Sequence, residues 1–170
     1  MNKKGFTLIE LLATIMILAI IMLVAVPNVM STIDKNKQST YVEDARRMIT
    51  LAEYELRSDT SIPTPTNGNC VVILLRALDL SEFDQGPEGG DYDIDSSYVV
   101  IARSGNKNIY MAALVENYDG GRRGVPLSTR SDLNKENAIR LVAKDSDLNI
   151  PTPTVGSKLS GYKVTKIVKS

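Results

Sequence analysis

The feature that most constrains this chain is an apolar run from Phe6 to Val26, in which Glu10 is the one charged residue. A helix of about 20 residues is about 30 Å long, which matches the hydrocarbon core of a bilayer. Lys3 and Lys4 precede the run, and positive charge at this border favours a cytoplasmic start. The run therefore predicts a membrane-spanning helix rather than the core helix of a soluble domain.

A removable secretory signal is the main alternative for such a segment. Signal-peptide cleavage requires small residues shortly after the apolar run. The sequence instead continues Pro-Asn-Val-Met-Ser from Pro27 to Ser31, without a small-x-small pair. We therefore expect the apolar helix to remain part of the protein.

The helical pattern continues beyond Pro27. Apolar side chains recur every three or four residues in one stripe, which predicts an amphipathic helix from about Asn28 to Arg57. This helix is expected to end before the SIPTPTNGN segment, since proline, glycine and asparagine interrupt helices. Pro27 is expected to kink or loosen the long helix, because proline removes one backbone donor. The stripe consists of Tyr41, Ala45, Met48, Ile49, Ala52 and Leu56.

Short apolar runs after this helix predict a small sheet. Tyr98–Arg103 and Ile109–Val115 are rich in β-branched residues and flank the short SGNKN turn, which predicts a hairpin. Tyr162–Val168 alternates between apolar and polar residues, which predicts a last strand. Val71–Leu80 fits a short helix packed on the core, with a strand as the alternative.

One further helix and several loops complete this part of the chain. Asp132–Ala143 predicts a helix with Ser131 or Asp132 as its cap. The segments DQGPEGGDYD, NYDGGRRGVP and IPTPTVGS are rich in turn-forming residues and predict loops. We therefore expect an α+β fold, in which a long N-terminal helix packs on a small antiparallel β-sheet head over residues 58–170. The first half of that helix is hydrophobic and the second half is amphipathic.

The composition gives little support for catalysis or cofactor binding. The chain of 170 residues has no histidine, the commonest general base and metal ligand in proteins. Its 20 basic and 20 acidic residues balance, so no basic excess indicates nucleic-acid binding by the head. We expect no enzyme activity, no cofactor and no metal site.

Three short motifs outside the N-terminal segment match functional sites only in part. Asp91–Asp95 begins like a calcium loop but has Ser96 and Ala102 at the glycine and glutamate positions, so a solvated acidic loop is expected. Asp119–Gly124 lacks the strand–loop–helix context of a phosphate site, so a surface loop is expected. The single cysteine, Cys70, excludes an intramolecular disulfide. It is expected to be a buried thiol, with an intermolecular disulfide or a modification as the alternative.

The segment KKGFTLIELLATIMILAIIMLVAVP closely resembles the N-terminus of type IV pilins and of their relatives, the type II secretion pseudopilins and competence pilins. The shared features are a short basic leader, the Gly-Phe-Thr-Leu-x-Glu border, an apolar span and a proline, here Pro27. The resemblance implies that a prepilin peptidase cuts between Gly5 and Phe6. It also implies that Phe6 becomes the new N-terminus and is methylated on its amino group.

This resemblance divides the chain into three parts. Residues 1–5 would be the prepilin leader, and residues 6–57 the N-terminal helix. Residues 6–26 of that helix would span the membrane and later form the filament core, and residues 58–170 would form the globular head. Gly5 suits the cleavage position, because a residue without Cβ fits a tight protease site.

Glu10 is expected to serve assembly. An isolated carboxylate in a membrane is costly, so such residues usually pair and mark function. The resemblance implies that the amino group of Phe6 in one subunit and Glu10 of a neighbour neutralise each other in the filament core. Glu10 lies about one helical turn after Phe6, so a pairing within one chain is the alternative; snorkelling of Glu10 to the interface is another. Pro27 either lets the filament stretch or bends the helix so that the head points away from the bundle.

The resemblance therefore predicts a structural subunit of a type IV pilus, which acts in adhesion, motility or biofilm formation. The subunit would sit in the membrane with a single span and would be polymerised into an extracellular filament at the cell surface. Its partners would be other pilins, prepilin peptidase and an assembly platform with its ATPase. A pseudopilin of a secretion or competence system is the first alternative, and a single-span membrane-anchored binding module is the second.

Overall fold

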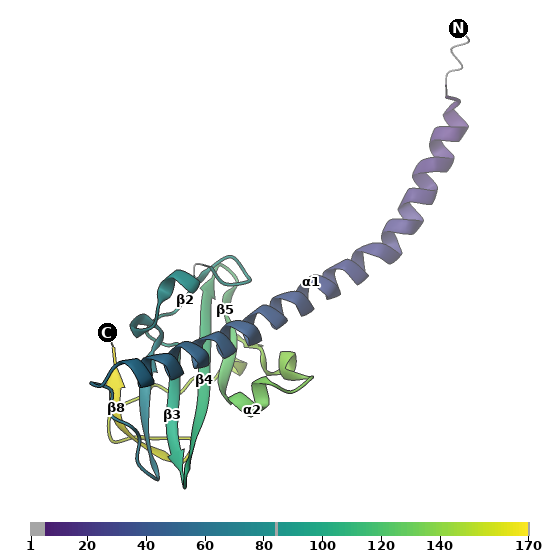
Figure 1. The fold of residues 1–170 in the computed structure, drawn as a ribbon. Helices are drawn as coiled ribbons and strands as arrows, with labels where there is room; N and C mark the ends of the chain where they lie inside the picture. The colour runs from purple at the N-terminus through teal and green to yellow at the C-terminus, as the bar shows by residue number, and fades with distance from the viewer. Residues whose placement is uncertain (1–5, 84, 170) are drawn as a thin grey trace. The chain divides into compact units, whose positions relative to one another are not determined.

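The computed structural model describes residues 6–83 and 85–169, and the chain forms two compact units, Met1–Asn36 and Lys37–Ser170. We call them the N-terminal unit and the C-terminal unit. One helix, α1 (Leu8–Ser58), runs through both units. Its 51 residues confirm the prediction of a single long helix (Figure 1). The helix continues through Pro27, and the expected kink at this residue stays a prediction.

The N-terminal unit is a helix without a core of its own. Every residue from 6 to 36 is exposed in the single chain. Large apolar side chains stand out on all sides of the helix, with Leu8 84% exposed and Leu23 77% exposed. A helix that is apolar all round must be covered by lipid or by other protein surfaces.

The second part of α1 belongs to the C-terminal unit and buries one stripe of side chains. This stripe contacts one face of a β-sheet, and the sheet lies behind the helix in Figure 1. The predicted amphipathic pattern is confirmed, although Leu56 is only partly buried. The buried positions of the helix are Tyr41, Val42, Ala45, Met48, Ile49 and Ala52.

In the residues that the structure describes, eight strands form one sheet, mostly antiparallel, so the predicted α+β class is confirmed. The order across the sheet is β6-β5-β4-β3-β1-β8-β7, and β2 pairs with β4 off this path. The pair β1 and β8 is parallel. The strands are β1 (Asn69–Leu74), β2 (Asp91–Tyr92), β3 (Tyr98–Ser104), β4 (Lys107–Tyr118), β5 (Gly121–Thr129), β6 (Ala143–Lys144), β7 (Lys158–Leu159) and β8 (Tyr162–Val168).

Both faces of the sheet are buried. Alternate residues of β1, such as Val71 and Ile73, pack in the cluster that α1 covers. Their neighbours Val72 and Leu74 pack in a second cluster with Leu159 and residues near the C-terminus. A strand that is covered on both sides is a nearly continuous apolar run and does not alternate with polar residues.

Double-sided burial explains the first difference from the sequence analysis. Val71–Leu80 is not a helix: β1 occupies its first part, and one 3₁₀ turn, Leu75–Ala77, follows. The alternative reading as a strand was the right one. The apolar run alone fits either structure, because a buried strand and a buried helix share the same composition.

The predicted loop NYDGGRRGVP is also wrong. β4 continues to Tyr118, and β5 begins at Gly121 directly after a tight turn. Gly121 has φ 118°, a conformation that favours glycine, so the Gly-Gly pair closes a hairpin here.

The predicted helix Asp132–Ala143 is replaced by two short pieces. These are α2 (Arg130–Leu133) and the 3₁₀ turn Ala138–Leu141. Thr129 caps α2, in place of the expected Ser131 or Asp132. The Asn-Lys-Glu-Asn stretch between the two pieces starts and ends with asparagine, which favours turns over helix interiors.

The predicted hairpin and last strand are confirmed. β3 and β4 contain the expected runs and pair antiparallel around Gly105 and Asn106. β8 matches the predicted Tyr162–Val168 in both bounds.

Candidate functional site

The first turn of α1 contains a pair of polar residues that belong to one hydrogen-bonding unit. The backbone N–H of Thr7 donates to Glu10 Oε2 at 2.9 Å, and the Thr7 hydroxyl donates to the same oxygen at 2.8 Å. The backbone N–H of Glu10 lies 3.4 Å from Thr7 Oγ1 in return. This reciprocal arrangement is a capping box, in which a threonine and a glutamate three positions later satisfy free donors at a helix start.

The capping box gives the carboxylate of Glu10 a place in an isolated chain. A negative charge in the first turn also interacts favourably with the helix dipole. Among the described residues, only Thr7 hydrogen bonds to this carboxylate, and both side chains are exposed. The group therefore remains accessible to a cation supplied by another molecule or by the N-terminus.

The sequence analysis named four site residues in this region. Gly5 lies outside the described residues. Phe6 precedes α1 and is 84% exposed, and Pro27 lies inside the helix. Glu10 is held by Thr7, a residue that the sequence analysis did not name as a site. The spacing Thr-x-x-Glu before an apolar run could have indicated it, because it is the sequence signature of a capping box.

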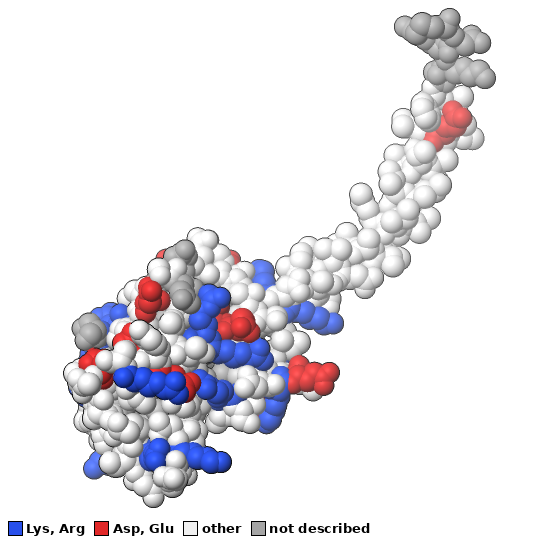
Figure 2. Space-filling model, in the orientation of Figure 1, with Lys and Arg blue, Asp and Glu red and all other residues white. Residues whose placement is uncertain are grey.

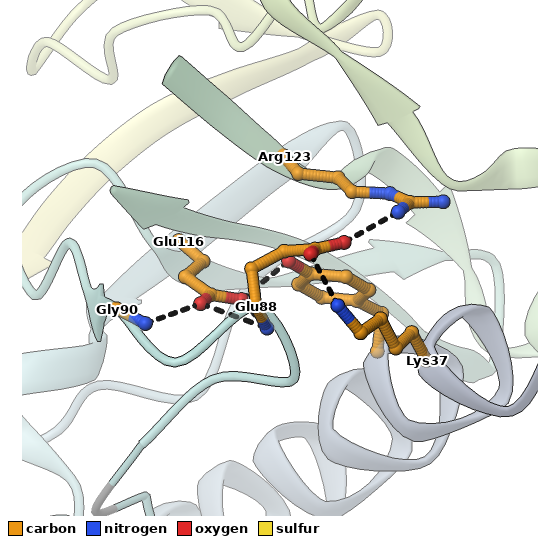
Figure 3. Close-up of polar contacts among 6 residues, drawn as sticks. Lys37, Glu88, Gly90, Glu116 and Arg123 are labelled. Carbon is orange, nitrogen blue, oxygen red and sulfur yellow. Dashed lines mark hydrogen bonds and ion pairs between the residues drawn. The ribbon is translucent and has the colours of Figure 1, made fainter. Parts of the chain in front are cut away.

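A second polar cluster lies in the C-terminal unit, around the buried side chain of Glu116 on β4. This carboxylate is 0% exposed and accepts a hydrogen bond from the Tyr41 hydroxyl of α1. It also accepts the backbone N–H of Gly90 at 2.8 Å and that of Glu88 at 3.1 Å. Figure 3 shows how these donors from the helix and from the loop before β2 converge on the one carboxylate.

Glu88 forms the outer layer of this cluster. Its carboxylate pairs with Lys37 of α1 at 2.6 Å and with Arg123 of β5 at 2.5 Å (Figure 3). The side chains of Glu88 and Arg123 are each 12% exposed. Burial alone would raise the pKa of Glu88, but the hydrogen bonds and charges of Lys37 and Arg123 outweigh it and lower this pKa.

The same region contains a third link between α1 and the loop. The Tyr92 hydroxyl donates to the carboxylate of Asp44 at 2.5 Å. Burial raises the pKa of Asp44 and the pKa values of both phenols, Tyr41 and Tyr92. Both phenols therefore stay protonated and act as hydrogen-bond donors at neutral pH.

This cluster connects α1 to the sheet. The carboxylates of Glu116, Glu88 and Asp44 all have hydrogen-bond or ion-pair partners within the chain. The loop segment 86–90 cannot lie further from Glu116 without losing two charge-assisted hydrogen bonds. Position 86 requires glycine, since a Cβ there would be 2.1 Å from Glu116 Cδ. The arrangement fixes the position of the loop and offers no free nucleophile or base.

The remaining motifs have structural roles. Cys70 is fully buried, and burial raises the pKa of its thiol to about 11, so the thiol stays protonated at neutral pH. The expected acidic loop is only partly a loop, because Asp91–Tyr92 forms β2 and pairs with β4. After this strand, Asp93 accepts the backbone N–H groups of Asp95 and Ser96 and so stabilises a turn. Within residues 6–83 and 85–169, no group of three or more His, Cys, Asp or Glu side chains is placed to hold a metal ion.

Comparison with known proteins gives one match, and it falls on the N-terminal segment. The family model described as the prokaryotic N-terminal methylation motif matches residues 1–26. No curated protein and no solved structure matches the chain. In the described part of the chain, one helix is long and apolar enough to cross a membrane: α1, whose most apolar window has a mean hydropathy of 2.8.

The two lines of observation agree. The matched segment contains the Gly-Phe border and the Thr7–Glu10 capping box, and it opens the helix that has exposed apolar side chains on all sides. The N-terminal segment of this chain is therefore a prokaryotic N-terminal methylation motif, the class III prepilin leader and apolar helix start found in type IV pilins and pseudopilins.

Proposed function

We propose that this chain is a structural subunit of a type IV pilus. The observation that carries the proposal is the apolar surface of residues 6–26, which follows a prepilin leader and is uncovered in the single chain. Such a surface needs lipid before assembly and the helices of other subunits after it. The subunit would act at the cell surface in adhesion, motility or biofilm formation.

The processing step would take place at the border of the apolar segment. Prepilin peptidase would remove residues 1–5 by cutting between Gly5 and Phe6, and the free amino group of Phe6 would then be methylated. Residues 6–57 would form the mature helix, with residues 6–26 in the membrane and later in the filament core. Residues 58–170 would form the part of each subunit on the filament surface.

Glu10 would orient the docking of a new subunit. Before assembly, the capping box with Thr7 accommodates its charge in the first turn of the helix. In the filament, the amino group of Phe6 of a neighbouring subunit would lie beside this carboxylate. An ion pair in a water-poor environment is much stronger than one in water, so correct register would be favoured over neighbouring ones.

The partners of the subunit would be other pilins, prepilin peptidase, the assembly platform and its ATPase. A pseudopilin of a type II secretion or competence system is the alternative function, since its subunits have the same N-terminal motif. A membrane-anchored binding module is the alternative from another class; it would keep Met1 and would not polymerise.

The test is the N-terminus of the protein, followed by its assembly state. The full chain is expressed with a prepilin peptidase, and its N-terminal peptide is measured by mass spectrometry. A methylated N-terminus at Phe6 supports the proposal, and a product that retains Met1 contradicts it. Electron microscopy of surface filaments labelled by antibody then distinguishes a pilus shaft from a short pseudopilus.

A substitution at Glu10 tests the docking role. Glu10→Ala should leave cleavage after Gly5 intact and reduce the amount of filament roughly tenfold or more, because the ion pair with the next subunit is lost. The matched control is Glu136→Ala, which removes an exposed carboxylate of the C-terminal unit. Normal filaments from the Glu10 variant would count against the role assigned to this residue.

A further inference from the structure

The C-terminal unit has one end that is basic and lacks acidic partners. The β3–β4 hairpin turns at Gly105 and Asn106, with Arg103 and Lys107 beside the turn. Lys163 of β8 pairs in register with both Asn69 of β1 and Lys158 of β7, which brings two further lysines to this end of the sheet. Figure 2 shows blue side chains without red neighbours at the end where the hairpin turns (Figure 2). We call Arg103, Lys107, Lys158 and Lys163 the basic end.

The charges of the basic end have no anionic partner among the described residues. Arg103 donates to the amide oxygens of Asn106 and Asn108, which are neutral. Lys107, Lys158 and Lys163 are exposed and form no ion pair within the described parts of the chain. Four like charges at one end repel each other, and an external anionic surface would relieve this repulsion.

The opposite end of the sheet contains a hollow with the complementary charge. A cavity of about 480 Å³ opens between the loop before β2 and the β4–β5 turn. Asp91 and Asp119 line it and are exposed, with no ion pair to any residue that the structure describes. The other lining residues are Glu88, Gly89, Gly90, Asn117 and Tyr118. We call this hollow the acidic cleft.

The acidic cleft has a fixed shape. One wall is the 86–90 loop, whose N–H groups at Glu88 and Gly90 are bound by the buried Glu116. A second wall is the tight turn from Tyr118 to Gly121. A preformed cleft loses little conformational freedom on binding, so weak charge pairs can contribute to the affinity of a partner.

The two ends lie at opposite termini of one strand. β4 begins at Lys107, in the basic end, and finishes at Tyr118, which lines the acidic cleft. At about 3.3 Å per residue, this strand separates the ends by roughly 35 Å. The two surfaces therefore cannot neutralise each other within one chain.

We infer that the basic end of one C-terminal unit docks into the acidic cleft of a second copy of this chain. The convex hairpin turn enters the concave cleft, and Lys107 faces Asp91 and Asp119. Because two different surfaces meet, the contact is head-to-tail and can repeat in an open chain. The inference rests on the proposed polymerisation, for which it names the contact between C-terminal units.

Charge balance favours a second copy over other anionic partners. Net charge is zero, with 20 basic and 20 acidic residues. Beside the cleft, Glu88 is already paired with Lys37 and Arg123, whereas Asp91 and Asp119 have no ion pair to a described residue. The same chain thus supplies both members of the charge pair, whereas a nucleic acid or an anionic lipid at the basic end would leave Asp91 and Asp119 without a partner.

Cysteine cross-linking tests the contact in the full chain. Lys107→Cys and Asp119→Cys are combined in a Cys70→Ser background, and the protein is oxidised in filaments and in detergent micelles. The two positions are too far apart to join within one molecule, so a ladder of multimers on denaturing gels reports contacts between copies. The matched control pairs Asp119→Cys with Lys135→Cys, whose lysine is 67% exposed and lies outside the basic end.

Charge reversal tests the same contact without cysteines. Lys107→Glu or Asp119→Lys alone should lower the sedimenting filament fraction about fivefold, because like charges would then meet. The combined variant should recover to within about twofold of the unmodified chain, since the pair is restored with opposite polarity. The loss in the single variants should be larger at low than at high salt.

The outcomes separate this inference from the proposed function. Normal filaments in both single reversals, or no recovery in the combined variant, would overturn the contact and leave the pilus proposal standing. If the unmodified chain forms no filament, the pilus proposal fails; a ladder in micelles then still supports the contact, and its absence overturns it. DNA or anionic vesicles bound by the basic end, without a ladder from the test pair, would assign this end to another partner and overturn the inference.

Discussion

The two units of the chain solve the problem of apolar surface in opposite ways. The C-terminal unit buries both faces of its sheet, and its central strand β1 has no residue from Cys70 to Leu74 that is more than 5% exposed. The N-terminal unit buries nothing from residue 6 to residue 36. The comparison teaches that the C-terminal unit is complete in a single chain, whereas the N-terminal unit is stable only when lipid or other chains cover it.

The carboxylates of the two units also differ in burial. Glu116 in the C-terminal unit is buried and satisfied by donors from its own chain. Glu10 in the N-terminal unit is exposed, and Thr7 supplies both of its described donors. A buried carboxylate whose hydrogen-bond partners come from its own chain stabilises the fold. An exposed carboxylate in an apolar surface is able to pair with a group of another molecule.

The largest expected effect comes from blocking the proposed cleavage at the start of the N-terminal unit. Gly5→Leu should prevent cleavage completely, because a bulky side chain does not fit the protease site. The expected product is an uncut, membrane-bound precursor, measured as a longer band on gels and as an intact leader by mass spectrometry. Normal unfolding of the C-terminal unit in the same sample is the control. Cleavage at the usual position would contradict the assigned border.

Removal of the central charge of the buried cluster should damage the C-terminal unit alone. Glu116→Gln leaves the donors of Tyr41, Glu88 and Gly90 facing an amide and should lower the free energy of unfolding by about 3 kcal/mol, because the amide nitrogen cannot accept the hydrogen bonds that the second carboxylate oxygen accepted. Chemical denaturation of the full chain in micelles, followed by near-ultraviolet circular dichroism of its tyrosines, measures this loss.

The matched control for this variant is Glu136→Gln, because Glu136 is exposed. That substitution should change the free energy of unfolding by less than about 0.5 kcal/mol. Equal effects of the two variants would show that the cluster around Glu116 does not hold the C-terminal unit together.

A smaller, pH-dependent effect is expected at Glu88. Its pKa is lowered in the folded chain, so its stabilising contribution is present above its ordinary value of 4.5 and is lost as the pH falls through the folded value. Glu88→Gln should therefore lower the free energy of unfolding by about 2 kcal/mol near neutral pH, because the ion pairs of Glu88 with Lys37 and Arg123 are lost. The difference from the unmodified chain should shrink as the pH falls below 4.5. A difference that is constant with pH would exclude an ionic role.

The smallest effect is expected at the start of α1, where Thr7 and Glu10 form the capping box. Thr7→Val removes the hydroxyl of the capping box and should cost about 1 kcal/mol of local helix stability. Hydrogen exchange of the first-turn amides, measured by NMR in micelles, detects this loss. Thr14→Val is the control, because the Thr14 hydroxyl bonds a carbonyl inside the helix. Equal protection in both variants would mean that the capping box does not order the helix start.

Much of the fold was accessible from local sequence patterns. The long helix, the β3–β4 hairpin and β8 follow from periodicity and turn residues within short stretches. β1 was ambiguous, because burial on both faces removes the alternation that marks a strand. β5 was missed because its sequence, GRRGVPLST, alternates weakly and contains Pro126.

The candidate site shows the same limit. Glu10 and the Gly-Phe border could be proposed as a site because they lie in one contiguous segment, and their roles stay predictions. The cluster around Glu116 was missed, because its members Lys37, Tyr41, Glu88 and Arg123 come from separate elements that only the folded chain brings together. The sequence around a single glutamate in a β-strand does not show which hydrogen-bond donors from other elements will contact it.

The parallel pairing of β8 with β1 has a consequence for biosynthesis. β8 lies between β1 and β7, so one side of β1 stays unpaired until the residues of β8 have left the ribosome. A nascent or truncated chain without β8 would expose the backbone hydrogen-bonding groups of Val71–Ile73. An exposed strand edge of this kind can pair with other chains and so promotes aggregation. Closure of this side of β1 therefore requires a strand that is synthesised long after β1 itself.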